Sequence, residues 1–429
     1  MLRFSLRSQS YKNASVSRLA CTNGQVFIRL LSLVLQSGYR YNQVVAPVLR
    51  DFAMNILTIG GATQDLFLQY RGADIMSIMK KTGTFTYMLF ESGEKVEVDS
   101  ISYLTGGGAT NTAVGFTRLG FKTASFCALG ADIPGDQVIN ELTTQGVDTS
   151  LIARLKDHST GTSYIVSSIH GERTIFTHRA ANAALNTVTL PLAAIATAKQ
   201  LYITSLSGAS ARILPAITEH AKKHNVPIAI NPGTSQLSTD ALSLKQSLKN
   251  IDIIIMNSFE ARTFMHALVQ KDAAYQSSFQ AADSKSRVPC GLNAEDSTAY
   301  LINHPLACHD MLFSMNNFFK EVLAMGPRIV VVTNGANGVY AASENKIWFC
   351  PSAKTTVISS VGAGDAFGSC FVGSMLNGAS IEESLQAGVI NSASVLSSIG
   401  AKTGLLSFND IQTQRTQLHD IKVSSFLLE

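Results

Sequence analysis

Paired cysteines and long apolar runs are both missing from this chain of 429 residues. None of its six cysteines belongs to a C-x-x-C pair, and scattered cysteines in a chain of this length favour reduced thiols. No apolar run approaches the roughly 20 residues that a membrane-spanning helix needs. The longest N-terminal candidate, residues 26–35, is interrupted by Arg29. These absences predict a cytoplasmic protein with no membrane span.

Two common nucleotide-binding motifs are absent as well. The chain contains no G-x-x-x-x-G-K-[ST], which argues against a P-loop kinase or NTPase. The first expected strand ends in Gly-Gly-Ala-Thr-Gln-Asp at residues 60–65, which is not G-x-G-x-x-G. A Rossmann dehydrogenase is therefore disfavoured too.

Acidic residues are almost missing from the first 53 positions, which hold seven Lys or Arg and one acid, Asp51. This Arg- and Ser-rich composition is typical of a transit peptide. Met54, however, begins a segment that resembles a natural protein start and leads directly into the first expected strand. Three interpretations follow for residues 1–53: an extension from a mis-assigned start, a targeting segment, or an ordered functional extension.

The remainder of the chain is mildly acidic, because the formal net charge is +4 and the first 53 residues carry +6. A body with a net charge of −2 argues against nucleic acid as the main partner. Hydrophobic residues make up 46% of the composition, which is enough for a sizeable core.

From Met54 onward the pattern alternates between strand and helix, which predicts an α/β fold with a parallel sheet covered on both faces. The expected strands are residues 56–59, 123–129, 201–204, 227–230, 251–256, 329–333 and 339–342. The expected helices are residues 109–119, 137–145, 209–223, 258–268, 364–376 and 381–398.

Three stretches break this rhythm. Residues 85–104, with a turn at 91–94, predict a hairpin, and residues 163–178, with a turn at 170–173, predict a second one. Residues 270–318 are irregular and are expected to be an insertion between a helix and the next strand. The possible zinc ligands of this insertion are Cys290, His304, Cys308 and His309. Their irregular spacing favours loop residues that occur there by chance over a metal site.

The most informative stretch is residues 359–367, Ser-Ser-Val-Gly-Ala-Gly-Asp-Ala-Phe, where three small residues run directly into an aspartate. Gly362, Ala363 and Gly364 let backbone N–H groups converge, and the following helical pattern adds partial positive charge at its N-terminus. These N–H groups form an anion hole. A carboxylate there, such as that of Asp365, competes with any bound anion, so a purely structural role would be unusual. The anion hole is a useful place for a base that takes a proton from a hydroxyl attacking a phosphoryl group. The alternative is a helix N-cap with a glycine turn.

A second glycine-rich stretch, Gly-Gly-Gly-Ala-Thr-Asn-Thr-Ala at residues 106–113, opens another helix and is followed by Gly120 and Gly130. The spacing of Asn111 and these glycines, with residues 362–365 near the C-terminus, resembles the paired signatures of the PfkB (ribokinase-like) family of sugar and nucleoside kinases. The resemblance covers roughly residues 54–408 and becomes specific because both signatures occur in the right order.

The resemblance implies a ribokinase-like three-layer α/β/α sandwich with a small β lid. The kinase domain would span residues 54–420, with the lid formed by about 66–105 and 160–180 and an insertion at about 270–318. Because such a lid has an exposed strand edge, the resemblance also implies a candidate homodimer through the lid.

The implied activity is transfer of a phosphoryl group from ATP to a hydroxyl. The positions that match the catalytic base and the anion hole are Asp365, Gly362, Ala363 and Gly364. The positions that match the acceptor site are Asp65, Gly106, Gly107 and Asn111. Glycines let hydroxyl groups approach the backbone, and an asparagine supplies both a donor and an acceptor. For Asp65, a local turn role is the alternative.

Magnesium and ATP are the implied cofactors. Asn257 and Glu260 resemble the family's N-x-x-E motif, which positions magnesium near the phosphates, partly through water. The alternative for this pair is a capping box at a helix start. The positions that resemble the ATP site are Thr333, Gly335, Gly338 and Asn391. Ser359 and Ser360 stand where the family usually carries Asp-Thr, which leaves activation by monovalent cations in doubt.

Sugars are the favoured acceptors, because Asp65 with Gly106 and Gly107 suggests a pocket for a polyol. The leading prediction is therefore a ribokinase- or fructokinase-like carbohydrate kinase. A nucleoside kinase of the adenosine type is the alternative, and a catalytically silent ligand-binding member is the alternative that is not an enzyme. The presence of Asp365 and Glu260 argues against the silent protein.

Overall fold

The computed structural model describes residues 55–70, 72, 74–80, 83–167, 173–272, 275, 280–281, 301, 306–308, 311–417 and 421–428. Contacts divide the chain into residues 1–53 and 54–429, and all described residues belong to the second unit. The three interpretations of residues 1–53 therefore stay predictions. Within the described part, no helix combines the length and the apolar character needed to cross a membrane.

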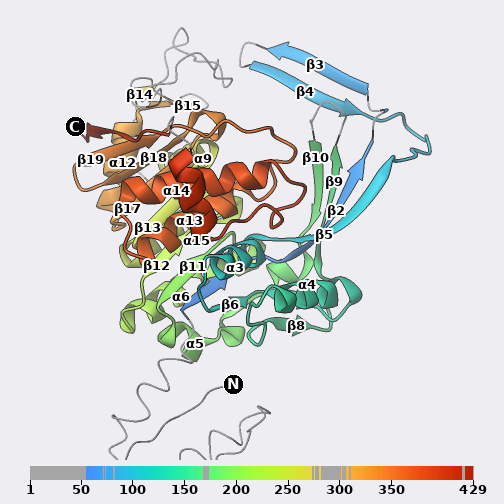
Figure 1. Cartoon of the computed structure of the whole chain (residues 1–429), viewed down its shortest axis with the longest axis horizontal. Helices are drawn as coiled ribbons and strands as arrows, with labels where there is room; N and C mark the ends of the chain where they lie inside the picture. The colour runs from blue at the N-terminus through green and yellow to red at the C-terminus, as the bar shows by residue number, and fades with distance from the viewer. Residues whose placement is uncertain are drawn as a thin grey trace, which may run out of the picture. The chain divides into compact units, whose positions relative to one another are not determined.

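The centre of the described structure is a nine-stranded sheet in the order β20-β19-β18-β17-β13-β12-β11-β1-β6 (Figure 1). The strands from β17 to β6 run parallel, and β18, β19 and β20 continue the sheet antiparallel. Their bounds are β1 (Ile56–Ile59), β6 (Thr123–Phe126), β11 (Gln200–Ile203), β12 (Ile228–Ile230), β13 (Ile253–Asn257), β17 (Ile329–Thr333), β18 (Val339–Ser343), β19 (Lys346–Cys350) and β20 (Ser424–Leu427). The predicted α/β fold is confirmed.

Helices cover both faces of this sheet. Successive residues of a strand point to opposite faces, so each face presents its own apolar side chains to the helices. Ile203 and Ile254 pack in one cluster with Phe264, whereas Tyr202 and Ile255 pack in another with Phe371. The first face carries α5 (Leu192–Thr197), α6 (Leu214–Lys223), α8 (Ala241–Ser247), α9 (Ser258–Lys271) and α12 (Met315–Ala324). The second carries α3 (Gly108–Arg118), α13 (Ala363–Leu376) and α14 (Ile381–Leu396).

Some boundaries differ from the predicted ones for local reasons. The expected strand 123–129 is divided, because β7 (Ala128–Gly130) leaves the main sheet to pair with β8 (Ala153–Leu155). Helix α4 (Ile133–Thr144) starts four residues before the expected position, because the side chain of Asp132 accepts a hydrogen bond from Gly135 N at 3.0 Å and caps it. The first turns of expected helix 209–223 form a 3₁₀ segment, η3 (Gly208–Ile213).

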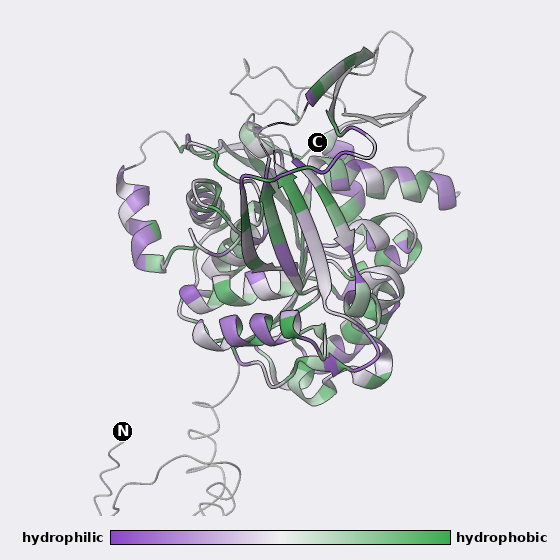
Figure 2. Cartoon of the chain, turned by 90° about the vertical axis from the view of Figure 1, so that its right-hand side faces the viewer, coloured by the Kyte–Doolittle hydropathy of each residue, from purple (hydrophilic) through white to green (hydrophobic). Residues whose placement is uncertain are grey.

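A second, four-stranded sheet stands beside the main body, in the order β10-β9-β2-β5 (Figure 1). Its strands are β2 (Thr63–Gln69), β5 (Ser100–Gly106), β9 (Gly161–Ser167) and β10 (Arg173–His178). The predicted hairpin 163–178 is confirmed by the antiparallel pairing of β9 with β10, although its expected turn lies largely outside the described residues. Figure 2 views the molecule from the side of this sheet and shows hydrophobic stretches along its strands.

The predicted hairpin 85–104 is wrong. Strand β4 (Gly83–Leu89) pairs with β3 (Asp74–Lys80), whereas β5 pairs with β2 along its whole length, from Ser100↔Gln69 to Gly106↔Thr63. The expected turn is present, since Glu94 N donates to Glu91 O at 3.3 Å. The strands on either side of it find partners earlier in the chain, which a local pattern does not reveal.

The expected insertion at 270–318 lies largely outside the described residues. Its described part contains a small antiparallel sheet of β14 (Gln280–Ala281), β16 (Met311–Phe313) and β15 (Leu306–Cys308). Of the possible zinc ligands, Cys290, His304 and His309 lie outside the description. The described residues themselves contain no group of three or more His, Cys, Asp or Glu side chains able to hold a metal ion.

Candidate active site

The two glycine-rich stretches meet although they are far apart in the sequence. Asp365 lies in the first turn of α13, and Asn111 lies in the first turn of α3, which packs against α13. Asn111 Nδ2 donates a hydrogen bond of 2.8 Å to Asp365 Oδ2. Asn111 Oδ1 is buried without a hydrogen-bond partner among the described residues. An unsatisfied buried acceptor beside a carboxylate is the arrangement that an incoming hydroxyl group would complete.

The start of α13 is open on the side of its backbone N–H groups. Gly362 precedes the helix with φ of 82°, and a Cβ at this position would clash with Ala401, so only glycine fits there. No side chain of the described residues caps this helix end. Gly364 is exposed, and a Cβ built on it would meet no described heavy atom within 4 Å. Because packing does not require glycine at 364, the free space above it suits the close approach of an anion.

Asp65 lies in β2, so the alternative of a turn aspartate is not what the structure shows. Asp65 is only 6% exposed, and its Oδ1 accepts a hydrogen bond from Thr63 Oγ1 at 2.9 Å. Gly106 faces it from β5, and a Cβ there would overlap Asp65 Oδ2. Gly107 has φ of 95° and would clash with the backbone of Gly61 if it carried a side chain. Gly106 and Gly107 therefore let the backbone at the end of β5 pass close to the carboxylate of Asp65.

Burial disfavours the charged forms of the two aspartates. Burial raises the pKa of Asp65, against hydrogen bonds from Thr63 and Ser163. Burial also raises the pKa of Asp365, while the hydrogen bond from Asn111 lowers it and the charge of Asp65 raises it further. Two carboxyl groups with raised pKa values at one sheet edge are typical of a functional site.

Asn257 and Glu260 form the capping box that the sequence left as an alternative. Asn257 Oδ1 accepts from Glu260 N at 2.8 Å, and Glu260 Oε2 accepts from Asn257 N at 2.8 Å. Burial raises the pKa of Glu260 to about 7, and the nearby charge of Asp365 contributes in the same direction. The capping box is therefore present, and it leaves Glu260 Oε1 available to another partner.

The expected nucleotide positions separate into two groups. Thr333 ends β17 directly beside Asn257 of β13, and Gly335 and Gly338 form the tight turn after it with φ of 57° and 87°. Asn391, in contrast, is 1% exposed, with Nδ2 donating to Ala366 O and Oδ1 accepting from Leu406 N, both at 2.9 Å. Its side chain joins α14 to α13, and the expected role of Asn391 at the ATP site stays a prediction.

Lys402 is a site residue that the sequence analysis missed. Its side chain is 6% exposed, and Nζ donates to Thr105 O at 2.8 Å and to Thr105 Oγ1 at 2.5 Å. Thr105 Oγ1 in turn donates to Glu141 of α4. Lysines are rarely buried, and Lys402 has no motif around it, so only the Gly-Ala pair before it marks this loop in the sequence.

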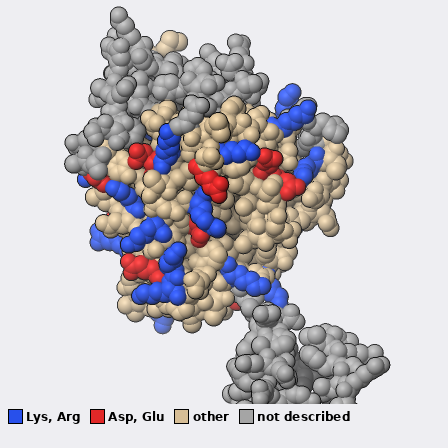
Figure 3. All heavy atoms as spheres, turned by 90° about the vertical axis from the view of Figure 1, so that its left-hand side faces the viewer, with Lys and Arg blue, Asp and Glu red and all other residues tan. Residues whose placement is uncertain are grey.

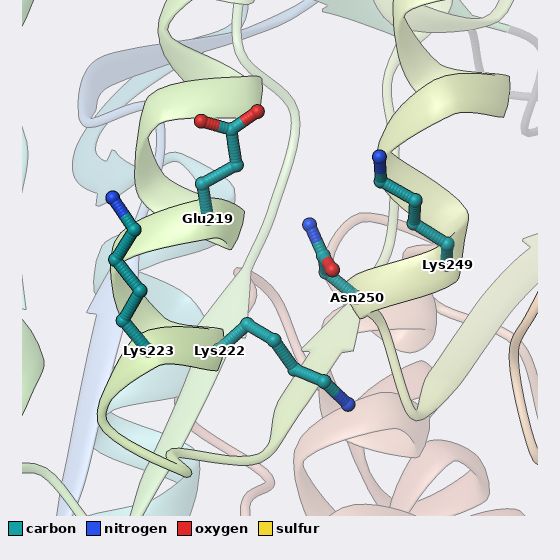
Figure 4. A pocket seen from close by; sticks show the side chains of 5 residues that line it. All are labelled: Glu219, Lys222, Lys223, Lys249 and Asn250. Atoms are coloured by element: carbon teal, nitrogen blue, oxygen red, sulfur yellow. The ribbon is translucent and has the colours of Figure 1, made fainter.

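A shallow groove of about 340 Å³ lies elsewhere and is lined by Glu219, Lys222, Lys223, Lys249 and Asn250 (Figure 4). These residues belong to α6 and to the 3₁₀ turn η4 (Leu248–Asn250), which precede β12 and β13 and so border their amino ends. Ligands of open α/β sheets bind at the carboxyl ends of the strands. Figure 3 shows basic and acidic side chains mixed over one face of the molecule, so charge alone marks no binding site on that face. We therefore place the candidate site at the carboxyl edge.

Comparison with known proteins gives a family match. The matching family model is described as "pfkB family carbohydrate kinase" and covers residues 76–285 and 314–407. A ribokinase of Haemophilus influenzae is 26% identical over 318 residues, which are 73% of this chain and 88% of the relative.

Solved structures with the same fold include two with bound nucleotide. Arabidopsis thaliana ribokinase, in complex with ribose and ATP, aligns with a TM-score of 0.64 at 17% identity over 84% of this chain and 98% of that chain. The E. coli protein designated ribokinase II, in complex with ATP and Mg²⁺, aligns with a TM-score of 0.62 at 17% identity over 85% and 99%. At these identities the likeness shows the fold alone.

Proposed function

Because the chain belongs to the pfkB family of carbohydrate kinases, we propose that it transfers the terminal phosphoryl group of ATP to a hydroxyl of a small sugar, as ribokinases and fructokinases do. The observation that carries this proposal is the contact of Asn111 Nδ2 with Asp365, beside the buried Asn111 Oδ1, which has no hydrogen-bond partner among the described residues. A hydroxyl bound there would lie between a hydrogen-bond acceptor and a carboxylate able to take its proton.

In this proposal each residue has a defined role. Asp65 accepts hydrogen bonds from other hydroxyl groups of the sugar, and Gly106 and Gly107 give the sugar access to the backbone. Asp365 takes the proton of the attacking hydroxyl, and the backbone N–H groups from Ala363 to Asp365 stabilise the negative charge on the transferred group. Thr333, with Gly335 and Gly338, would border the nucleotide phosphates.

Magnesium fits the donors that are present. Mg²⁺ in phosphoryl-transfer sites is held by one or two carboxylates, by waters and by the phosphates themselves. Glu260 offers a second carboxylate oxygen besides the one in the capping box, and burial together with the charge of Asp365 raises its pKa to about 7. Glu260, with Asn257 beside it, would hold the ion through water, and the ion would neutralise charge on the phosphates.

Glu260→Gln is expected to raise the Mg²⁺ concentration needed for half-maximal activity more than it raises the KM of the acceptor. Glutamine still accepts the hydrogen bond from Asn257 N, so the capping box and the helix survive. The loss of the charge weakens the hold on the ion. Titrations of Mg²⁺ and of acceptor on the same variant measure both effects.

Glu383→Gln is the matched control, because Glu383 occupies the same position in the capping box of Ser380 at the start of α14. It should leave the magnesium requirement unchanged. If Glu260→Gln behaved like this control, or weakened only acceptor binding, the metal role would be wrong.

The acceptor class is tested by following ADP formation with a panel of pentoses, hexoses and nucleosides. A carbohydrate kinase forms ADP fastest with one of the sugars. Faster turnover with adenosine would favour the nucleoside alternative, and binding without ADP formation would favour a catalytically silent protein.

We also propose that residues 54–420 make up the kinase domain, together with β20, which pairs with β19 in its main sheet. Deleting residues 1–53 should leave a folded, active enzyme, because β1 already has β6 and β11 as its two neighbours and the described sheet takes no strand from upstream. Expression from Met54, followed by thermal melting and activity assays, measures this. An inactive or insoluble product beside an active full-length chain would show that the extension is part of the structure.

The expected homodimer through the lid stays a prediction. Leu66, Tyr103, Tyr164 and Phe176 lie in one row across the four strands, on the face of the sheet opposite to Asp65. Tyr103 and Phe176 are 64% and 56% exposed. This row is the apolar surface that pairing of two lids would cover.

A further inference from the structure

Lys402 carries a charge that the roles described above do not use. Its buried ammonium group bonds Thr105, the next-to-last residue of β5. The last residue of β5, Gly106, lies against Asp65. A tether between two loops could be made with a neutral side chain at lower desolvation cost, since burying an ammonium ion is expensive. The position of the charge therefore calls for a reason beyond packing.

The groups around the ammonium come from several elements. Glu141 of α4 lies nearest, with Oε1 at 3.7 Å from Nζ. Asp65 of β2 and Asp365 of α13 also interact electrostatically with Lys402, and so does the thiol of Cys127, whose pKa burial raises to about 12. Burial lowers the pKa of Lys402, and the three carboxylates oppose this effect. The cluster thus contains one cation for three carboxylates.

Building on the phosphoryl-transfer function proposed above, we propose that Lys402 is a positioning residue whose charge keeps Asp65 and Asp365 ionised together and whose hydrogen bonds hold the end of β5 beside the acceptor. A protonated Asp365 could not accept the proton of the attacking hydroxyl. Glu260 of α9 and Tyr202 of β11 also lie within electrostatic range of Asp365, and a charged Glu260 opposes its ionisation. Lys402 acts against this repulsion.

The sign of the pH effect follows from the direction of the shift. Burial raises the pKa of Asp365, so activity is complete above that value and is lost as the pH falls through it. The positive charge of Lys402 lowers this pKa, so its removal must move the acid limb of the activity profile to higher pH.

The test measures kcat/KM of the acceptor against pH, at saturating ATP and Mg²⁺, for wild type and three variants. Lys402→Gln removes the charge and should shift the acid limb upward by about one pH unit or more, the usual effect of losing an opposite charge within several ångströms. Lys402→Arg keeps the charge and should leave the limb near its wild-type position. Lys402→Met also removes the charge but fills a similar space with apolar atoms, and it should shift the limb upward as Lys402→Gln does.

A purely structural tether predicts a different set of results: lower melting temperatures with an unmoved acid limb. That outcome in a folded Lys402→Gln variant would overturn the proposal. If this variant does not fold, Lys402→Met still decides, since an unmoved acid limb without the charge contradicts the proposal. A wild-type profile without any acid limb would instead overturn the role of Asp365 as base, on which the inference rests.

Discussion

Asp365→Asn is expected to lower turnover by about 10²–10⁴-fold, the usual contribution of a general base. The amide has the shape of the carboxylate but cannot accept a proton. ATP binding should persist, because the nucleotide is proposed to contact the backbone of α13 and the strand ends near Thr333. The melting temperature should not fall, because the substitution removes a carboxylate whose pKa burial and Asp65 both raise. Steady-state kinetics, nucleotide titration and thermal melting on one preparation measure all three.

Asp410→Asn is the matched control, because Asp410 lies in the first turn of α15 (Phe408–Gln417) and its carboxylate accepts hydrogen bonds from the neighbouring Ser407. It should keep full turnover. If Asp365 were merely a helix-start residue, both variants would lose some stability and retain near-normal turnover. Activity of Asp365→Asn within tenfold of wild type would remove this residue from the mechanism.

Asp65→Ala is expected to lower kcat/KM for the acceptor by about 10²–10⁴-fold while sparing ATP binding. The carboxylate can accept hydrogen bonds from two sugar hydroxyls, each charge-assisted and worth about 1.5–3 kcal/mol. Tenfold in rate corresponds to about 1.4 kcal/mol, which gives the stated range. The acceptor KM and kcat, together with the melting temperature, are the quantities to measure.

Asp252→Ala provides the comparison. Asp252 is also hydrogen-bonded, accepting from Ile228 N at 2.9 Å and pairing with Arg328, but it is only half-buried and lies at the amino end of β13. Its loss should lower the melting temperature with little effect on the acceptor kinetics. If Asp65→Ala showed that same pattern, the acceptor-site assignment would fail, and with it the preference for a sugar.

The sequence predicted the main sheet well because burial on both faces leaves a strong local pattern. Strands β1 and β17 have the predicted bounds, and α13 begins one residue from the predicted start. The hairpin 85–104 failed because the choice between β2 and β4 as the partner of β5 depends on contacts that a local window does not contain. The early start of α4 was readable in principle, from Asp132 followed by Pro134.

The candidate site was predictable where its residues begin helices at the carboxyl edge of the sheet. Asn111 and Asp365 meet for this reason, since each follows a glycine-rich turn. Lys402 was missed because its partner Thr105 lies 297 residues away in the chain. The contacts of Asn391 could not be predicted from the sequence, because its position on α14 does not reveal that its side chain bonds Ala366 O and Leu406 N.

The transfer of label from ATP to a sugar tests the central claim most directly. The protein is incubated with Mg²⁺ and ATP labelled in its terminal phosphoryl group, with and without a pentose such as ribose, and the products are separated. The account predicts a labelled sugar phosphate, formed in proportion to ADP with the wild-type protein and nearly absent with Asp365→Asn. Label found only in inorganic phosphate for every sugar of the panel, at a rate independent of the sugar, would contradict it.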